Sequence, residues 1–165
     1  MRKAISLLLS LCIIIFSACS QKDSAAESDV RLYYVSTEFN ENNPGIALVT
    51  ETLQYEGDGQ PDVGTIIGQM VSGPKNSSVM RSPVYGIELV NWSVTENTVT
   101  LTFAAGYGEL QGLERTFADA CVTLTLLQLD YLTGVAVTWI GSDENAEMMT
   151  EQSFSLDQEW GTQAE

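Results

Sequence analysis

One stretch, residues 113–141, limits what this chain of 165 residues can fold into more than any other part. It begins with an amphipathic helix pattern, in which apolar residues recur every three or four positions: Leu113, Phe117, Ala120, Cys121, Leu124, Leu127 and Tyr131. Thr123 lies on the narrower polar stripe, which can meet water. Gly134 follows where a left-handed residue can end a helix, and residues 135–140 are a β-branched and aromatic run typical of a strand. The stretch therefore predicts one long helix packed on one sheet.

Other patterned segments extend this arrangement over residues 30–141. A short helix is expected between Asp62, a suitable N-cap, and Gly73-Pro74, because proline cannot continue a helix. The element order is ββαββαβ, with strands expected at residues 30–37, 46–55, 87–94, 98–104 and 135–140. This order predicts an α+β domain, with a mixed or antiparallel sheet of about five strands and two helices on one face. We expect the acidic residues 142–165 to form a loose tail.

The N-terminus has the features of a bacterial export signal. Arg2 and Lys3 precede an apolar run, residues 4–16, which has the length of a signal-peptide core and is shorter than a stable membrane span. We therefore expect residues 1–18 to be a signal peptide that is removed.

The signal leads into Ser17-Ala18-Cys19, which resembles a lipobox, the bacterial processing site at which a cysteine receives lipid and becomes the new N-terminus. Phe16 stands where leucine is usual in a lipobox. We expect Cys19 to be lipidated and residues 19–29, which are small, polar and acidic, to form a flexible tether. Ordinary secretion with cleavage near Ala18 is the alternative.

Charge and cysteine content exclude several classes of function. The chain has 7 basic and 22 acidic residues and a net charge of −15, which argues against binding to nucleic acid or to anionic lipid. Removal of the signal would take away two basic and no acidic residues, so the mature net charge would be −17. After processing only Cys121 remains as a free thiol, so no disulfide can form within the domain. The sequence contains no histidine, which disfavours zinc binding and Cys–His catalysis.

Taken in order, these pieces resemble the GerMN domain of sporulation and spore-germination lipoproteins, over roughly residues 30–141. The matching segments are Val30-Arg31-Leu32-Tyr33-Tyr34, Met70-Val71-Ser72-Gly73-Pro74, Ser82-Pro83 with Gly86, Thr100-Leu101-Thr102-Phe103, Val122-Thr123-Leu124-Thr125 and Gly134-Val135. Thr102 stands where an acidic residue is common in the family, and one copy is present here whereas the best-known members carry two. The resemblance implies an extracytoplasmic α+β module without known enzymatic activity, related to ring-building motifs of envelope assemblies, and it supplies no catalytic residues.

Three short motifs suggest chemistry, and each lacks an essential part. Gly106-Tyr107-Gly108 with Gly112 falls short of a dinucleotide-binding fingerprint in spacing and in its acidic residue, so we expect a glycine-rich loop. Ser72 and Lys75 have S-x-x-K spacing, but Pro74 prevents one helix from carrying both. The acidic loop around Asp58 lacks the glycine and glutamate of a calcium site. We therefore predict no catalytic residue, no metal site and no cofactor.

Three aromatic residues are the candidates for a partner-binding surface: Tyr85, Trp92 and Tyr107. We expect Tyr85 and Tyr107 in loops. Core packing is favoured for Trp92, because Val90 and Val94 share its face of the strand.

These observations predict a lipid-anchored, non-enzymatic module on the extracytoplasmic face of the bacterial cell membrane. It would act in envelope- or spore-related assembly through contacts with a protein or with peptidoglycan, and would not bind nucleic acid. The alternative is a lipoprotein that binds a glycan or small ligand in the loops near Tyr85 and Tyr107. A carboxylate-based wall hydrolase ranks third.

Overall fold

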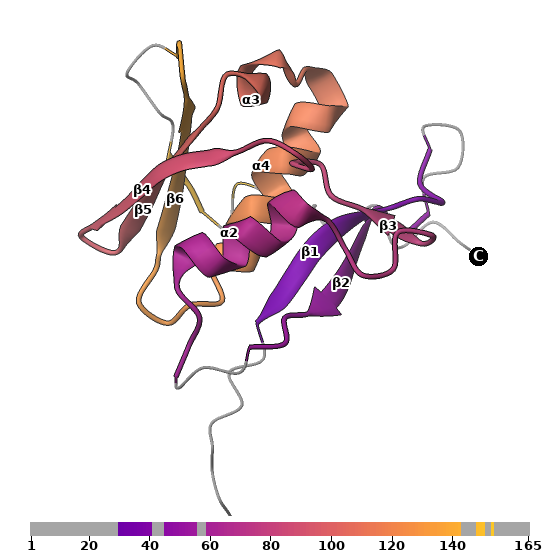
Figure 1. Cartoon of the computed structure of the whole chain (residues 1–165), viewed down its shortest axis with the longest axis horizontal. Helices are drawn as coiled ribbons and strands as arrows, with labels where there is room; N and C mark the ends of the chain where they lie inside the picture. The colour runs from indigo at the N-terminus through magenta and orange to yellow at the C-terminus, as the bar shows by residue number, and fades with distance from the viewer. Residues whose placement is uncertain (1–29, 41–44, 56–58, 143–147, 151–152, 154–165) are drawn as a thin grey trace, which may run out of the picture.

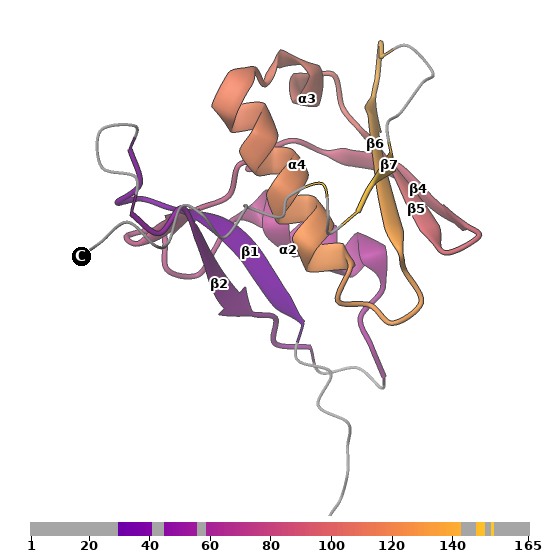
Figure 2. The same ribbon diagram turned by 180° about the vertical axis from the view of Figure 1, so that it is seen from behind.

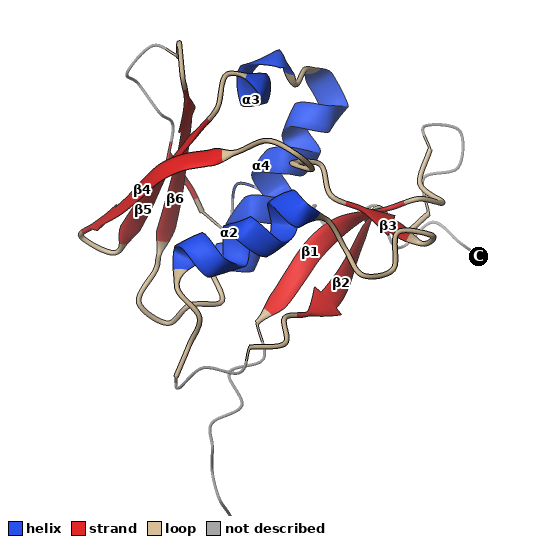
Figure 3. Cartoon of the chain, in the orientation of Figure 1, coloured by secondary structure: helices blue, strands red, loops and turns tan. Residues whose placement is uncertain are grey.

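The computed structural model describes residues 30–40, 45–55, 59–142, 148–150 and 153. Within them the chain forms two sheets with helices packed between them (Figures 1 and 3). The elements are β1 (Arg31–Ser36), β2 (Leu48–Thr52), α2 (Val63–Ser72), β3 (Met80–Arg81), β4 (Leu89–Thr95), β5 (Thr98–Phe103), α3 (Gly106–Glu109), α4 (Gly112–Leu126), β6 (Gly134–Trp139) and β7 (Met148–Met149). Among the described residues, no helix has the length and apolarity needed to cross a membrane. The expected signal peptide, Cys19 and the tether lie outside these residues.

The α+β class is confirmed, but the strands are divided between two sheets instead of forming one sheet of about five. The three-stranded sheet has the order β2-β1-β3 and is antiparallel throughout. The four-stranded sheet has the order β4-β5-β6-β7, and its central pair, β5 and β6, is parallel. Seen from behind, α2 and α4 again lie between the two sheets (Figure 2). Two residues of the expected tail, Met148 and Met149, form β7 and pair with β6.

The β4–β5 hairpin and the strand that follows it are set by local sequence. Glu96 and Asn97 both have positive φ, 49° and 68°, which is the backbone of the turn that suits a tight antiparallel hairpin. On β5 the expected alternation is confirmed, because Val99, Leu101 and Phe103 are buried and the threonines between them are half-buried. A parallel partner requires a crossover, and α3 and α4 provide it between β5 and β6.

The short helix α2 begins and ends as predicted. The Asp62 carboxylate accepts a hydrogen bond from the Thr65 backbone N–H (2.8 Å) and so caps the N-terminus. Gly73 ends the helix with a φ of 89°, a value that side chains disfavour. Its N–H donates to the carbonyls of Gln69 and Met70.

The long helix α4 ends earlier than the apolar spacing predicts, at Leu126 instead of near Gly134. The side-chain amide of Gln128 donates to the carbonyls of Leu124 (3.3 Å) and Thr125 (3.1 Å), which lack a partner in the next helical turn. The same amide donates to the Arg31 carbonyl (2.6 Å), so the helix end is tied to β1. Gly134 is therefore the first residue of β6 and does not cap a helix.

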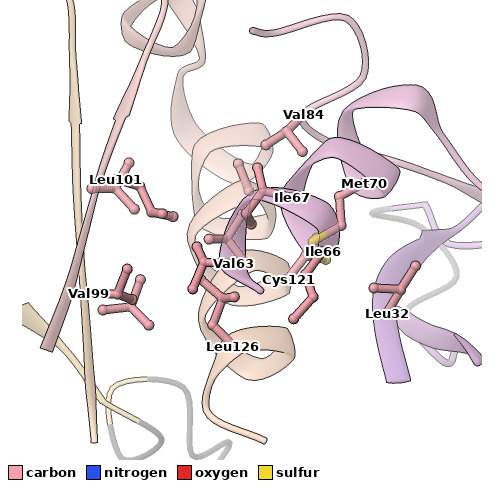
Figure 4. Close-up of a cluster of buried hydrophobic side chains, with 14 of the residues drawn as sticks. Leu32, Val63, Ile66, Ile67, Met70, Val84, Val99, Leu101, Cys121 and Leu126 are labelled. Atoms are coloured by element: carbon pink, nitrogen blue, oxygen red, sulfur yellow. The ribbon is translucent and has the colours of Figure 1, made fainter. Parts of the chain in front are cut away.

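One core joins both sheets to the helices. It includes Leu32 from β1, Leu101 from β5 and Leu126 from α4, all fully buried (Figure 4). Thr123 was expected to face water but is fully buried, with its hydroxyl directed to the Met149 sulfur (3.8 Å). The polar stripe of α4 is covered at this position, because β1 packs on one side of the helix and the β6–β7 pair on another.

Candidate functional site

The main candidate site is a groove of about 500 Å³ between α2 and β4. We call it the α2–β4 groove. Gly64, Gly68 and Val71 of α2 line one side of it, and Glu88, Val90 and Trp92 belong to the segment that lines the other. Its volume lies in the range of ligand-binding clefts in proteins.

Two glycines of α2 make the groove hollow. Gly64 and Gly68 are four residues apart, so they lie on the same face of the helix. A Cβ at Gly68 would contact nothing within 4 Å, whereas a Cβ at Gly64 would lie 3.1 Å from the indole nitrogen of Trp92. The face of α2 toward β4 is therefore bare backbone at these two positions, with the indole against one of them.

Trp92 is both packed and accessible. It is opposite Leu101 in the register, so both side chains are on the helix-facing side of the sheet. Trp92 nevertheless remains 39% exposed, because β4 is at the sheet edge and α2 meets only part of the ring. Its indole N–H has no hydrogen-bond acceptor among the described residues. Val90 and Val94, which were expected to share its burial, are 50% and 40% exposed.

Tyr85 lies at the other end of α2. The residue is 71% exposed, and its ring stands beside Gly73, where a Cβ would lie 3.1 Å from the Cδ2 atom of Tyr85. The Gly86 N–H donates to the Val71 carbonyl (2.9 Å) and holds this segment against the helix end. Because α2 has 10 residues, its two ends are about 15 Å apart. Tyr85 and Trp92 therefore flank opposite ends of the helix.

Tyr107 does not belong to this surface, because the segment expected as a loop contains α3 and turns the ring inward. Tyr107 is fully buried and stacks on Phe103, with ring centroids 4.6 Å apart. Its hydroxyl donates to the Asp119 carboxylate (2.8 Å). The Arg115 guanidinium lies over the rings of Tyr107 (4.6 Å) and Trp139 (4.3 Å) and pairs with Asp119 (3.1 Å). These contacts pair the members of the cluster with one another and hold α3 on α4 and β6.

Burial also governs the titration of the groups in the core. Burial, followed by the negative charge of Asp119, raises the pKa of Tyr107 far above its ordinary value. Burial raises the pKa of the Cys121 thiol to about 12, an effect opposed in part by the positive charge of Arg81. Cys121 is therefore a protonated core residue and a poor nucleophile.

The other motifs that suggested chemistry have structural roles where they are described. The Ser72 hydroxyl donates to the Gly68 carbonyl within α2 (2.8 Å), so it is not aimed at Lys75. No group of three potential metal ligands occurs among the residues described. Asp58 lies outside them.

The sequence singled out Tyr85 and Trp92 but not the groove between α2 and β4. The available signal was the spacing of Gly64 and Gly68, which suggested only a weak helix. The groove depends on Trp92 and Val90 lying opposite those glycines, which is a tertiary contact that neither segment specifies alone.

Comparison with known proteins identifies the fold. No protein-family model and no curated protein matches the sequence. The tandem GerMN domains of the sporulation protein GerM from Bacillus subtilis match 76% of this chain at 20% identity, with a TM-score of 0.55. This chain spans 45% of that structure. A Clostridium perfringens protein provisionally described as a lipoprotein matches 75% of this chain and 89% of its own, at 11% identity and a TM-score of 0.46. The likeness to GerM establishes the architecture, and we conclude that this chain has a GerMN-like fold.

Proposed function

We propose that this chain is a lipid-anchored, non-enzymatic module of the extracytoplasmic cell envelope that binds a partner through the α2–β4 groove. The observation that carries the proposal is the GerMN-like fold, since the matched domains belong to a sporulation protein. The expected lipobox at Cys19 supports attachment to the membrane surface. In an organism that forms spores, the role would be in spore development or germination.

The properties of the groove favour a function in binding. It is open, it is lined by an exposed indole and an exposed valine, and its helix α2 is packed on the core through Val63, Ile66, Ile67 and Met70. Accessible aromatic side chains beside apolar ones are typical of protein-binding surfaces. The net charge of −15 makes an acidic partner unfavourable.

Anchoring is tested with a Cys19→Ala variant produced in the native bacterium. We expect this variant to leave the membrane fraction and to appear in soluble form outside the cell, because the sulfur that accepts lipid is gone. Cys12→Ala, a change within the apolar run of the signal, is the matched control and should remain in the membrane fraction. Retention of Cys19→Ala in the membrane would refute the lipid anchor.

Partner binding is tested by crosslinking intact membranes and purifying the chain. A defined envelope protein that is recovered with wild type and lost with Trp92→Ala would support the proposal. Tyr55→Ala alters another partly exposed aromatic residue, 41% exposed and outside the groove, and should retain the partner. Equal recovery with both variants would place the binding surface elsewhere.

Binding to peptidoglycan is the second candidate, and the groove itself favours it. Asn91 and Glu88 line the groove beside Trp92, and a sugar ring can stack on an indole while its hydroxyls bond to such polar groups. Sedimentation of the purified chain with isolated peptidoglycan, weakened by Trp92→Ala, would support this candidate. Turnover of labelled wall fragments that disappears in Glu88→Gln would instead reveal an enzyme.

A further inference from the structure

The strand that borders the groove has a free edge. In the four-stranded sheet β4 is terminal, and among the residues described it pairs only with β5. In an antiparallel pair, alternate residues direct their backbone N–H and C=O groups away from the partner strand. Every second residue of β4 therefore presents unpaired donors and acceptors on the outer edge, where another strand could bind them.

Apart from a register shift near its start, this edge lacks the usual protection against pairing. Natural edge strands are commonly short, or carry lysine, proline or an interrupting bulge. β4 has 7 residues, Leu-Val-Asn-Trp-Ser-Val-Thr, without lysine, arginine or proline. The register shift lies between Leu89 and Asn91, so from Asn91 to Thr95 the strand pairs regularly. The residues from 90 to 95 are all exposed.

The groove leaves open space beside the middle of α2. A strand added to β4 would run about 4.8 Å from it, beside the face of α2 that carries Gly64 and Gly68. At Gly68 the space beyond the helix backbone is empty to 4 Å. A side chain of an added strand could therefore enter the groove at Gly68, next to the indole that rests on Gly64.

The charges around the groove indicate which kind of partner segment would bind there. Glu88 lines the groove, and the Asp62 carboxylate lies beside Gly64, 3.2 Å from where a Cβ would be. Glu96 follows the last residue of β4. None of the lysine and arginine residues of the described chain lines the groove: Arg31, Lys75, Arg81 and Arg115. An incoming lysine or arginine would meet carboxylates and the face of an indole, which attracts cations.

We propose that β4 binds an extended, basic segment of a partner protein, which adds an antiparallel or parallel strand to the free edge and places its apolar side chains in the α2–β4 groove. Backbone hydrogen bonds to β4 give affinity for any extended segment. Specificity comes from the side chains of the bound segment, which alternate between valine- or threonine-like and basic residues. This inference rests on the proposed function and names the chemistry of the partner.

The test is a selection from a random library of twelve-residue peptides. The bait is the mature chain with Cys19→Ala, and the pool is depleted on the same chain carrying Gly68→Leu. Leucine at position 68 fills the groove, and because no neighbour lies within 4 Å of the added Cβ, we expect the variant to fold and to unfold at the wild-type temperature or above. Thr65→Leu adds the same side chain to an exposed position of α2 outside the groove and serves as the matched control.

We expect enriched peptides that contain lysine or arginine among β-branched residues. Gly68→Leu should weaken their binding at least 10-fold, whereas Thr65→Leu should leave it unchanged. Methylation of alternate backbone nitrogens in the best peptide should abolish binding, since it removes the donors that pair with β4 while keeping every charge. NMR should place the wild-type peptide along the β4 backbone.

Three outcomes would overturn the inference: no enrichment over the Gly68→Leu chain, enrichment of proline-rich or acidic peptides, or equal binding of the methylated peptide. Groove-dependent binding of peptidoglycan fragments without peptide enrichment would assign the site to a glycan. The proposed function fails separately, through retention of Cys19→Ala in the membrane or the absence of any envelope partner. A crosslinked envelope protein that survives Gly68→Leu would refute the β4 inference and binding through the groove, while the lipid-anchored envelope role would stand.

Discussion

At the scale of single residues, Gly108 shows how closely α3 is held to the four-stranded sheet. A Cβ at this position would lie 2.6 Å from Cδ1 of the Trp139 ring, which is itself covered by Arg115. Gly108→Ala should therefore lower the free energy of unfolding by about 1–3 kcal/mol, the usual cost of overpacking. Urea denaturation measures this loss. Gly106→Ala, two residues earlier with nothing within 4 Å, should be close to neutral, and equal effects of the two changes would contradict this packing.

Stability should decline at alkaline pH because buried acids keep their protons. The unfolded Cys121 thiol ionises near its ordinary pKa of 9.0, whereas burial raises its folded pKa to about 12. Below pH 9 both states hold the proton and the thiol has no effect. Above pH 9 the unfolded state binds fewer protons, so the free energy of unfolding falls by about 1.4 kcal/mol per pH unit for this group. Tyr34 and Tyr107, whose pKa values burial also raises, add to the decline above pH 10.

The measurement is urea unfolding between pH 8 and pH 11. Cys121→Ala removes the thiol and should reduce the slope between pH 9 and pH 10, whatever its effect on absolute stability. An unchanged slope would show that Cys121 ionises equally in the folded and unfolded states.

At the scale of elements, α2 contains two glycines that should respond oppositely to the same change. Gly68→Ala should raise the free energy of unfolding by about 0.5–1 kcal/mol, because alanine favours the helix and the site is open. Gly64→Ala gains the same helical preference but places a methyl group 3.1 Å from Trp92 and 3.2 Å from Asp62. It should be neutral or destabilising. Thermal and urea unfolding of both variants distinguish them, and equal stabilisation would mean that Trp92 does not rest on Gly64.

Elements were predictable from sequence where their determinants are local. The alternation of β5, the Asp62 cap and the end of α2 at Gly73 are each determined by a few neighbouring residues. The structure confirms all three. The end of α4 was not predictable in this way, because the Gln128 side chain that ends it is shared with Arg31, which is 97 residues away. Tyr107 was misplaced for a similar reason, since its inward position depends on Asp119 of the following helix.

The division of the strands into two sheets also could not be predicted from local sequence patterns. Alternation identifies which face of a strand is buried but not the sheet to which it belongs. Strand β1 packs on α4 and pairs with β2 and β3, while β5 pairs with β4 and β6. Of the candidate site, two of the three aromatic residues were found on the exposed surface, whereas the groove required the packing of α2 beside β4.

At the scale of the whole molecule, the shared core predicts cooperative unfolding. Leu101 belongs to the four-stranded sheet and is fully buried in the cluster that also contains Leu32 of β1. Leu101→Ala should cost about 2–5 kcal/mol, and hydrogen exchange should accelerate in β1 as well as in β5. Val94→Ala, at the partly exposed neighbour of Val99, should have a smaller effect throughout. Exchange that accelerates only in β4, β5 and β6 would mean that the two sheets unfold independently.

The placement of the helices between two sheets also has a mechanical consequence. The described chain begins at β1, and the first backbone groups of that strand are fastened to Gln128 at the end of α4. In the described structure no strand of one sheet pairs with a strand of the other. Tension applied between the start of β1 and a partner bound at β4 would therefore be transmitted through the side chains packed around α4. The packing of this helical layer would determine the force at which the domain unfolds.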